Sequence, residues 1–247
     1  MIINKKYSPE AVLLYIKNKK LKFKTTICKT TLYSYIYKGV FLNIKEENYI
    51  YKRKRKNSKI IRKNTGCSYK RGRNIEDRNK EICKRNIYGH WELDTVCGKR
   101  EKGKCLLVLT ERKTRQEIVK LIDGKTTEGV VKAFNEMEKE IGFEAFRNKF
   151  KTITCDNGKE FSDFAGIERS AIFPTKTRTQ LYYCHPYSAW ERGSNENCNK
   201  LVRRWLPKGQ SLNDCTIPEI EAIQTWINEY PRKIFNGLSS YELLYNV

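Results

Sequence analysis

The stretch from residue 90 to residue 122 restricts the fold of this 247-residue chain more than any other part. Its segments "HWELDTVCG", "KCLLVLTERK" and "RQEIVKLI" alternate between apolar and polar residues or run apolar over strand lengths, and only short connections separate them. The next segment, "TTEGVVKAFNEMEKEI", has apolar residues at helical spacing behind a capping threonine, Thr126 or Thr127. The sequence therefore predicts three strands in an antiparallel meander, followed by a helix.

The segments after residue 141 complete the prediction of a fold class. "KFKTITCDNG" is typical of a strand that ends in a turn at Asn157 and Gly158. A region without a clear period extends to about residue 187, and helices are predicted at about 188–205 and at "TIPEIEAIQTWINEY". The order of three strands, a helix, a strand and then mainly helices predicts an α/β domain with a mixed sheet, which we place at 87–247.

Positive charge is concentrated in the first third of the chain. Residues 1–86 hold 25 Lys and Arg against 6 Asp and Glu, whereas residues 87–247 hold 25 against 22. A regional excess of this size attracts a polyanion, and for DNA the affinity comes largely from counterion release. The charge therefore indicates a nucleic-acid partner for the N-terminal part, with a solvated basic tail as the alternative.

Two short helices are predicted within residues 1–44. In "YSPEAVLLYIKNK" Ser8 is the expected N-cap, and in "KTTLYSYIYKG" either Thr30 or Thr31 is expected to cap. The pair resembles a helix-turn-helix, but it has no room for a preceding helix and could be incomplete. The residues expected on the face available to a DNA groove are Tyr33, Ser34 and Tyr37.

Residues 45–86 are predicted to be a basic linker. The run "YKRKRKNSKIIRKNTGCSYKRGRN" has too few spaced apolar residues to bury a face. We interpret it as a strap along DNA phosphates, and the alternative is a disordered spacer. The expected phosphate contacts are Lys52, Arg53, Lys54, Arg55 and Lys56.

Composition excludes several other classes. The nine cysteines are odd in number and contain no C-x-x-C pair, which favours free thiols over a disulfide framework or a zinc knuckle. Two histidines rule out an all-His metal site. No apolar run is long enough to span a bilayer and no signal core is present, so we expect a cytoplasmic protein without a membrane partner.

Three carboxylates form a candidate metal site. Asp94 lies in the middle of the first predicted strand, Asp156 ends the strand after the first helix, and Glu196 lies on the late helix. An Asp in a central strand is disfavoured by burial unless its charge is compensated, and a divalent cation can do this. Carboxylates without histidine suit Mg²⁺ or Mn²⁺, and two such ions can clamp both reacting oxygens of a phosphodiester.

Each carboxylate also has a purely structural explanation. Asp94 could pair with a buried Lys or Arg, and Asp156 could form only the turn before Asn157 and Gly158. Glu196 could be an ordinary exposed helix residue. The hypothesis of a metal site therefore depends on the three residues as a set.

Four motifs resemble the insertion-sequence transposases of the IS-thirty family. They are "GHWELDTVCGK", "LTERKTR", "CDNGKEF" and "HPYSAWERGSNENCNKLVRRWLPKG", in this order. The resemblance is strong over 87–247 and weaker over 7–56. It implies an RNase H-like, retroviral-integrase-type catalytic core, in which the catalytic and metal-binding triad falls on Asp94, Asp156 and Glu196.

The resemblance also implies a reaction and its partners. We expect cleavage of a phosphodiester at an element end with two Mg²⁺ or Mn²⁺ ions, and then attack of the freed 3′ hydroxyl on target DNA. The enzyme would be bacterial, would associate with the nucleoid when bound and would act as a homo-oligomer on DNA. Beyond Glu196 on the same helix, the expected phosphate contacts are Lys200, Arg203 and Arg204, with an ordinary solvated face as the alternative.

The sequence departs from the family pattern at three places. Leu93 stands where the family usually has Gly, and the interval from Asp156 to Glu196 is longer than expected, with "TKTRTQ" as the predicted insertion. Members are also usually longer at the N-terminus. The alternatives are therefore a truncated, non-catalytic DNA-binding protein of repressor type, or an RNase H-fold nuclease without strand transfer.

Overall fold

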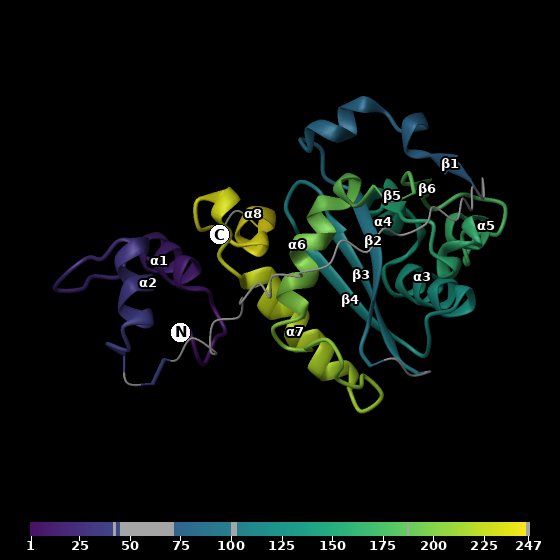
Figure 1. Ribbon diagram of the computed structural model, residues 1–247. Helices are drawn as coiled ribbons and strands as arrows, with labels where there is room; N and C mark the ends of the chain where they lie inside the picture. The colour runs from purple at the N-terminus through teal and green to yellow at the C-terminus, as the bar shows by residue number, and fades with distance from the viewer. Residues whose placement is uncertain (42, 45–71, 100–102, 187, 246–247) are drawn as a thin grey trace. The chain divides into compact units, whose positions relative to one another are not determined.

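The described residues form two compact units (Figure 1). The computed structural model describes residues 1–41, 43–44, 72–99, 103–186 and 188–245. Those within Met1–Cys67 and Glu229–Val247 form the first unit, and those within Ser68–Asn228 form the second. The sequence had placed the catalytic core at 87–247, whereas the residues from Glu229 onward pack with the N-terminal helices.

A six-stranded mixed sheet forms the centre of the second unit. Its order is β1-β6-β5-β2-β3-β4, and only the contacts of β3 with its two neighbours are antiparallel. The α/β class and the antiparallel meander are therefore confirmed. The strands are β1 (Arg73–Asn74), β2 (His90–Cys97), β3 (Cys105–Glu111), β4 (Glu117–Ile122), β5 (Thr152–Cys155) and β6 (Gln180–Tyr183).

The sheet has the strand order of the RNase H-like fold. Without β1, the order is β4-β3-β2-β5-β6. Among these five strands β3 is the second in the sequence, and it runs antiparallel to the other four. Such a sheet needs helices on both faces to cover its buried central strands. The helices of this unit are α3 (Thr127–Ile141), α4 (Phe143–Lys149), α5 (Phe164–Glu168), α6 (Gly193–Val202) and α7 (Ile217–Glu229).

Alternation along β2 divides its side chains between two helical layers. Trp91 and Leu93 are buried in the main core together with Phe134 of α3. Glu92 and Asp94 point to the opposite face, where α6 lies (Figure 1). Leu93 therefore fills the core on the side of the sheet away from Asp94.

Helix α3 begins where the sequence predicts it. Thr126 is the N-cap, and its side-chain oxygen accepts a hydrogen bond from the backbone N–H of Gly129. Val130, Phe134 and Met137 are buried against the sheet. The predicted apolar stripe is therefore the packing face of this helix.

Part of the predicted linker is folded. Residues 45–71 lie outside the described part of the chain. Beyond them, β1 pairs in parallel with β6, and 3₁₀ turns follow at Ile75–Asp77 and Lys80–Lys84. Arg78 is 6% exposed and donates a hydrogen bond to Thr154 Oγ1 on β5 at 2.8 Å. Residues 73–84 therefore contain regular structure that Arg78 ties to the sheet, although most of their other polar side chains are exposed.

The predicted insertion "TKTRTQ" contributes to the core. Within it, the guanidinium of Arg178 is fully buried and pairs with Glu138 of α3 at 2.9 Å. Arg178 also donates to the backbone oxygens of Ile167 and Gly166. Through these three acceptors Arg178 therefore holds α3, α5 and the approach to β6 together.

The first unit contains α1 (Pro9–Asn18), α2 (Lys29–Tyr37) and α8 (Ser240–Tyr245). Ser8 caps α1 as predicted, because its side chain accepts from the backbone N–H of Ala11. The cap of α2 is Cys28, so the prediction of Thr30 or Thr31 was wrong. Leu32 and Ile36 of α2 are buried in a small core of this unit.

Residues near the C-terminus complete the first unit. The hydroxyl groups of Ser8 and Tyr230 are 2.9 Å apart, and the ring of Tyr230 packs edge-on against Tyr7 with centroids 5.2 Å apart. Lys19 at the end of α1 forms an ion pair with Glu242 of α8 at 2.8 Å. The helical unit is therefore built from both ends of the sequence.

Candidate active site

Asp94, within β2, and Asp156, the residue directly after β5, lie side by side on two central strands. β2 and β5 are parallel, with Trp91 beside Ile153 and Glu92 beside Thr154. Continuing this register by two residues puts Asp94 beside Asp156. The parallel register therefore brings together the two carboxylates predicted from sequence.

Arg192 connects the two carboxylates. Its Nη2 donates to Asp156 Oδ2 at 2.8 Å, and its Nη1 is 3.5 Å from Asp94 Oδ1. Nη1 also donates to the backbone oxygen of Leu93 at 2.9 Å. The Arg192 side chain is only 12% exposed. A guanidinium therefore partly compensates the negative charge of the Asp pair within the site.

Opposing influences act on the pKa of the Asp94 carboxyl. Burial raises the pKa of its carboxyl above the ordinary value, and the neighbouring charge of Asp156 raises the pKa further. The guanidinium of Arg192 lowers it, as do hydrogen bonds from the backbone of Thr95 and the side chain of Asn199. The net pKa is raised, so Asp94 is a carboxylate that gains strongly from a nearby cation.

Glu196 points away from the Asp pair. It lies in the first turn of α6, its side chain is 65% exposed, and its Oε1 is 3.5 Å from the ammonium of Lys200. One turn further along α6, Asn199 donates to Asp94 Oδ2 at 2.9 Å. The helix of the predicted third carboxylate therefore contacts the site, while the carboxylate itself faces solvent.

The beginning of α6 is held against the sheet by buried polar contacts. The backbone N–H of Asn195 donates to Glu92 Oε2 at 2.9 Å, and Glu92 also pairs with Arg112 at 2.8 Å. Thr110 of β3 donates to the side chain of Asn195, and Arg115 donates to Ser194. These contacts fix α6 relative to β2, and hence Glu196 relative to Asp94.

The structure adds Glu160 and Arg192 to the surroundings of the Asp pair, and the sequence did not single out Arg192. Glu160 is 4% exposed, accepts a hydrogen bond from Thr95 Oγ1 at 2.8 Å and pairs with Lys125 at 3.1 Å. It therefore packs beside the strand of Asp94 instead of capping a helix in solvent. The signal for Arg192 was its position, since it directly precedes the helix that carries Glu196.

His185 belongs to an ion cluster at the border of the site. Its Nδ1 is 2.7 Å from Glu191 Oε1 and its Nε2 is 3.2 Å from Glu76 Oε1. Both carboxylates raise the pKa of this imidazole, with the hydrogen bond from Glu191 as the main cause. Glu191 thus binds a loop histidine, and the open question of His185 is answered in favour of loop packing.

The residues present fit a divalent cation in their chemistry but not in their described arrangement. Across the described ranges, no group of three or more His, Cys, Asp or Glu side chains is arranged to hold a metal. Asp94 and Asp156 are hard oxygen donors, and beside them Asn199 Oδ1 is buried without a hydrogen-bond partner. A site with two carboxylates and an unsatisfied amide oxygen suits Mg²⁺ or Mn²⁺ once Arg192 and Glu196 change rotamer.

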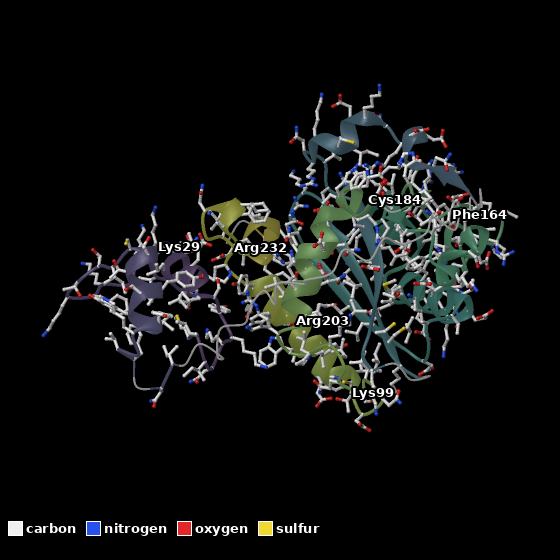
Figure 2. All side chains as sticks on the ribbon, viewed as in Figure 1. Lys29, Lys99, Phe164, Cys184, Arg203 and Arg232 are labelled. Atoms are coloured by element: carbon white, nitrogen blue, oxygen red, sulfur yellow. The ribbon has the colours of Figure 1, made fainter. Side chains whose placement is uncertain are left out.

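The predicted phosphate contacts on α6 are only partly available. Lys200 is 48% exposed. Arg203, labelled in Figure 2, donates to the backbone oxygens of Cys97 at 2.7 Å and Leu206 at 3.4 Å, because the helix ends at Val202 and turns it toward the sheet. Arg204 is half-buried. The side chain of Arg203 is thus engaged by backbone oxygens, and its contact with a phosphate stays a prediction.

Of the DNA-contacting residues predicted in the N-terminal part, some lie within the described residues and others do not. On α2, Tyr37 is 76% exposed, whereas Tyr33 and Ser34 are half-buried. Tyr35 is also exposed, at 39%. The basic cluster of Lys52, Arg53, Lys54, Arg55 and Lys56 lies outside the described residues.

Cysteine and membrane features follow the composition. Eight of the nine cysteines are described, and each of these has a free thiol. Among the described helices, none combines the length and the apolar character that a membrane span requires.

Comparison with known proteins gives three informative relatives. The transposase for insertion sequence element IS4351 of Bacteroides fragilis is 30% identical over 98% of this chain. A probable transposase for the insertion-like element IS1161 of Streptococcus salivarius is 36% identical over 86%. The InsI transposase for IS30A of Escherichia coli is 31% identical over 70%. This chain spans 70%, 57% and 42% of their lengths, respectively.

Fold and site together define the class of the second unit: an RNase H-like α/β protein with paired carboxylates on its central strands. The chain belongs to the IS30 family of insertion-sequence transposases. The resemblance drawn from its motifs is therefore confirmed. No protein-family model matches the chain. Among solved structures, it is similar to the catalytic core domain of BIV integrase, with 16% identity, a TM-score of 0.43, and coverage of 64% of this chain and 93% of that one.

Proposed function

We propose that this chain cleaves DNA at the ends of an insertion sequence and transfers the freed 3′ ends to target DNA. The observation that carries the proposal is the side-by-side position of Asp94 and Asp156 on two parallel strands. Membership of a transposase family supports it independently. The active form is proposed to be a homo-oligomer on DNA, in a bacterial cytoplasm and associated with the nucleoid.

Asp94, Asp156 and Glu196 are the proposed ligands for two Mg²⁺ or Mn²⁺ ions. When bound, such ions activate water as a nucleophile and stabilise charge on the attacking and leaving oxygens of the phosphodiester. Glu196 can join the two aspartates by a side-chain rotation, since its exposed position leaves its rotamers free. Glu92 and Asn199 keep α6 and Asp94 in place during this rotation.

The basic residues are proposed to bind the DNA backbone. Lys200 lies next to Glu196 and can contact a phosphate beside the reacting one. The net positive charge of residues 1–86 attracts DNA over a longer range. We keep the division of the chain into a helical DNA-binding segment at 1–44, a basic segment at 45–86 and a catalytic segment at 87–247 as a functional proposal, with Tyr33, Ser34 and Tyr37 on the groove side.

A cleavage and joining assay tests the proposal. The substrate is a labelled duplex with the element's own flanking repeat, incubated with Mg²⁺ or Mn²⁺ and target DNA. Asp94→Asn and Glu196→Gln should each abolish cleavage, whereas Glu136→Gln on the exposed face of α3 should leave it unchanged. Full activity of both site variants would contradict the proposed triad.

One observation favours a second candidate function. Glu196 pairs with Lys200, and Arg192 already partly compensates the charge of the Asp pair, as in a protein that binds DNA without cutting it. DNA binding by the wild type without any cleavage product would support this non-catalytic alternative. Cleavage without joined products would instead identify a nuclease that does not transfer strands.

A further inference from the structure

Arg192 takes the place that a cation would occupy between the two aspartates. Its guanidinium contacts one oxygen of Asp156 at 2.8 Å and one of Asp94 at 3.5 Å. A bidentate guanidinium is the side chain whose shape and permanent charge best satisfy two carboxylates at once. Protein charge therefore compensates the pair in the absence of any ion.

The surroundings of Arg192 show that this is a built contact. The side chain is 12% exposed, and besides its hydrogen bond to Asp156 it donates a second one to the backbone oxygen of Leu93, which fixes it against β2. The charges of Asp94 and Asp156 raise the pKa of Arg192, while burial opposes them. An arginine held by three groups, two of them charged, orients both carboxylates toward one point.

A divalent ion and this guanidinium need the same oxygen atoms. Asp156 Oδ2 and Asp94 Oδ1 both face Arg192. A metal ligand set cannot include these oxygens while they accept hydrogen bonds from a cation, since two positive charges would be held at one position. Entry of the ion therefore requires Arg192 to move.

We propose that Arg192 is a positioning residue that holds Asp94 and Asp156 together before metal binding and is displaced by the incoming ion. This inference rests on the proposed metal site. Arg192 lies at the junction of a 3₁₀ turn, Ala189–Arg192, and the first residue of α6. It can leave the carboxylates by side-chain rotation, because Glu92 and Thr110 hold the helix itself.

The first test measures binding of Mn²⁺ alone to the full chain by calorimetry at pH 8. Arg192→Gln should bind Mn²⁺ about tenfold more tightly, since no charge-assisted hydrogen bonds have to be broken. Its thermal midpoint without metal should be lower than that of wild type. Arg192→Lys keeps the charge and should return affinity toward the wild-type value.

Arg147→Gln is the matched control, because Arg147 is an exposed arginine on α4. It removes the same charge and should leave the Mn²⁺ affinity unchanged. Equal or weaker Mn²⁺ binding by a folded Arg192→Gln variant would overturn the inference. A purely structural role of Arg192 would give that result, since the substitution would then only lower stability and loosen the site.

The second test uses the wild type and does not depend on folding of a variant. Phenylglyoxal labels accessible guanidinium groups, and peptide mass spectrometry reads the label at Arg192 and Arg147. Saturating Mn²⁺ should raise the labelling rate of Arg192 several-fold and leave that of Arg147 unchanged. An unchanged or lower rate at Arg192 would refute displacement. If wild type and Arg192→Gln both fail to bind Mn²⁺, the proposed metal site fails, and this inference fails with it.

Discussion

Glu92 and Asp94 are two residues apart on one strand and face the same helix, yet their charges are compensated in different ways. Glu92 is fully buried, with Arg112 as its ion-pair partner and the N–H of Asn195 as a further donor. The Asp94 side chain remains 25% exposed and shares Arg192 with Asp156. A fully buried ion pair is a structural contact, whereas a carboxylate in a partly exposed ion pair can exchange its partner for a ligand.

Glu92→Gln should strongly destabilise the second unit. The substitution leaves the buried guanidinium of Arg112 without its counter-charge, which costs about 3–5 kcal/mol of unfolding free energy. Urea unfolding followed by tryptophan fluorescence measures this unit, because all four tryptophans of the chain lie within Ser68–Asn228.

Glu136→Gln provides the control for Glu92. Glu136 pairs with Lys132 at 3.9 Å on the exposed face of α3, and such a pair contributes about 0.3–0.5 kcal/mol. A similar loss of unfolding free energy for Glu92→Gln and Glu136→Gln would show that the buried ion pair stabilises the unit no more than the exposed one.

His90 should make the stability of the second unit depend on pH. Burial lowers the pKa of its imidazole from 6.5 to about 4, and Lys151, Arg112 and Arg78 contribute to the decrease. The folded state therefore binds the proton more weakly than the unfolded state. The stabilisation is present above pH 6.5 and is lost as the pH falls toward 4, by at most about 3 kcal/mol.

Comparison with His90→Asn isolates this effect from the titration of carboxylates. His90 Nδ1 lies 2.8 Å from Thr152 Oγ1, and asparagine retains a polar group at that position without titrating. Between pH 6.5 and 4 the unfolding free energy of wild type should fall more steeply than that of the variant. Parallel pH profiles would mean that His90 titrates normally in the folded protein.

At the scale of elements, the strands and helices predicted correctly are those in which apolar residues recur at a regular spacing. The meander of β2, β3 and β4 and the helix α3 follow from alternation and helical spacing. Strand β6 was missed because it is only four residues long, and because its approach includes Arg178, a buried charge that reads as a loop residue. α4 was missed because Gly142 alone separates it from α3.

The site was predictable to the extent that the strands determine it. Asp94 in the middle of one predicted strand and Asp156 at the end of another were predicted to belong to one site, and the register of β2 and β5 puts them side by side. The partnership of Arg192 depends on where α6 begins, and helix boundaries are weakly encoded in sequence. The rotamer of Glu196 depends on solvent and ions, which no local pattern specifies.

Gly142→Ala should destabilise the junction of α3 and α4. Gly142 has φ 84° and ψ 157°, a conformation that is essentially restricted to glycine and costs other residues about 1–3 kcal/mol. An added Cβ would meet no atom within 4 Å, so the expected loss is due to the backbone alone.

Gly193→Ala is the matched comparison for Gly142. Gly193 is the first residue of α6, has φ −61° and also has no atom within 4 Å of an added Cβ. Its replacement should leave stability unchanged or raise it by up to about 1 kcal/mol. Urea unfolding of both variants measures the difference; equal effects would contradict the backbone explanation.

At the scale of the whole molecule, the two units have separate cores. The core of the second unit surrounds Leu93, Leu107 and Phe134, whereas that of the first includes Ile2, Leu32 and Ile36. Tyr230 is buried in the first unit, although the whole second unit precedes it in sequence. A substitution in one core should therefore act on that unit alone.

Tyr230→Ala should destabilise the first unit selectively. The loss of a buried aromatic ring costs about 3–5 kcal/mol, and here the contacts with Tyr7 and Ser8 disappear as well. Hydrogen exchange should become faster for the amides of α1 and stay unchanged for those of β3. Tyr245→Ala is the control, since Tyr245 is 66% exposed; faster exchange in β3 would show that the units unfold together.

The contacts of α1 with residues 229–247 impose an order on protein synthesis. The N-terminal helices leave the ribosome first, but Tyr230 and Glu242 are translated only after the entire sheet. Domains fold as units while the chain grows, so the α/β unit can reach its fold first. The helical unit then forms as one of the last steps, and a nascent or interrupted chain would have a folded sheet but no completed helical unit.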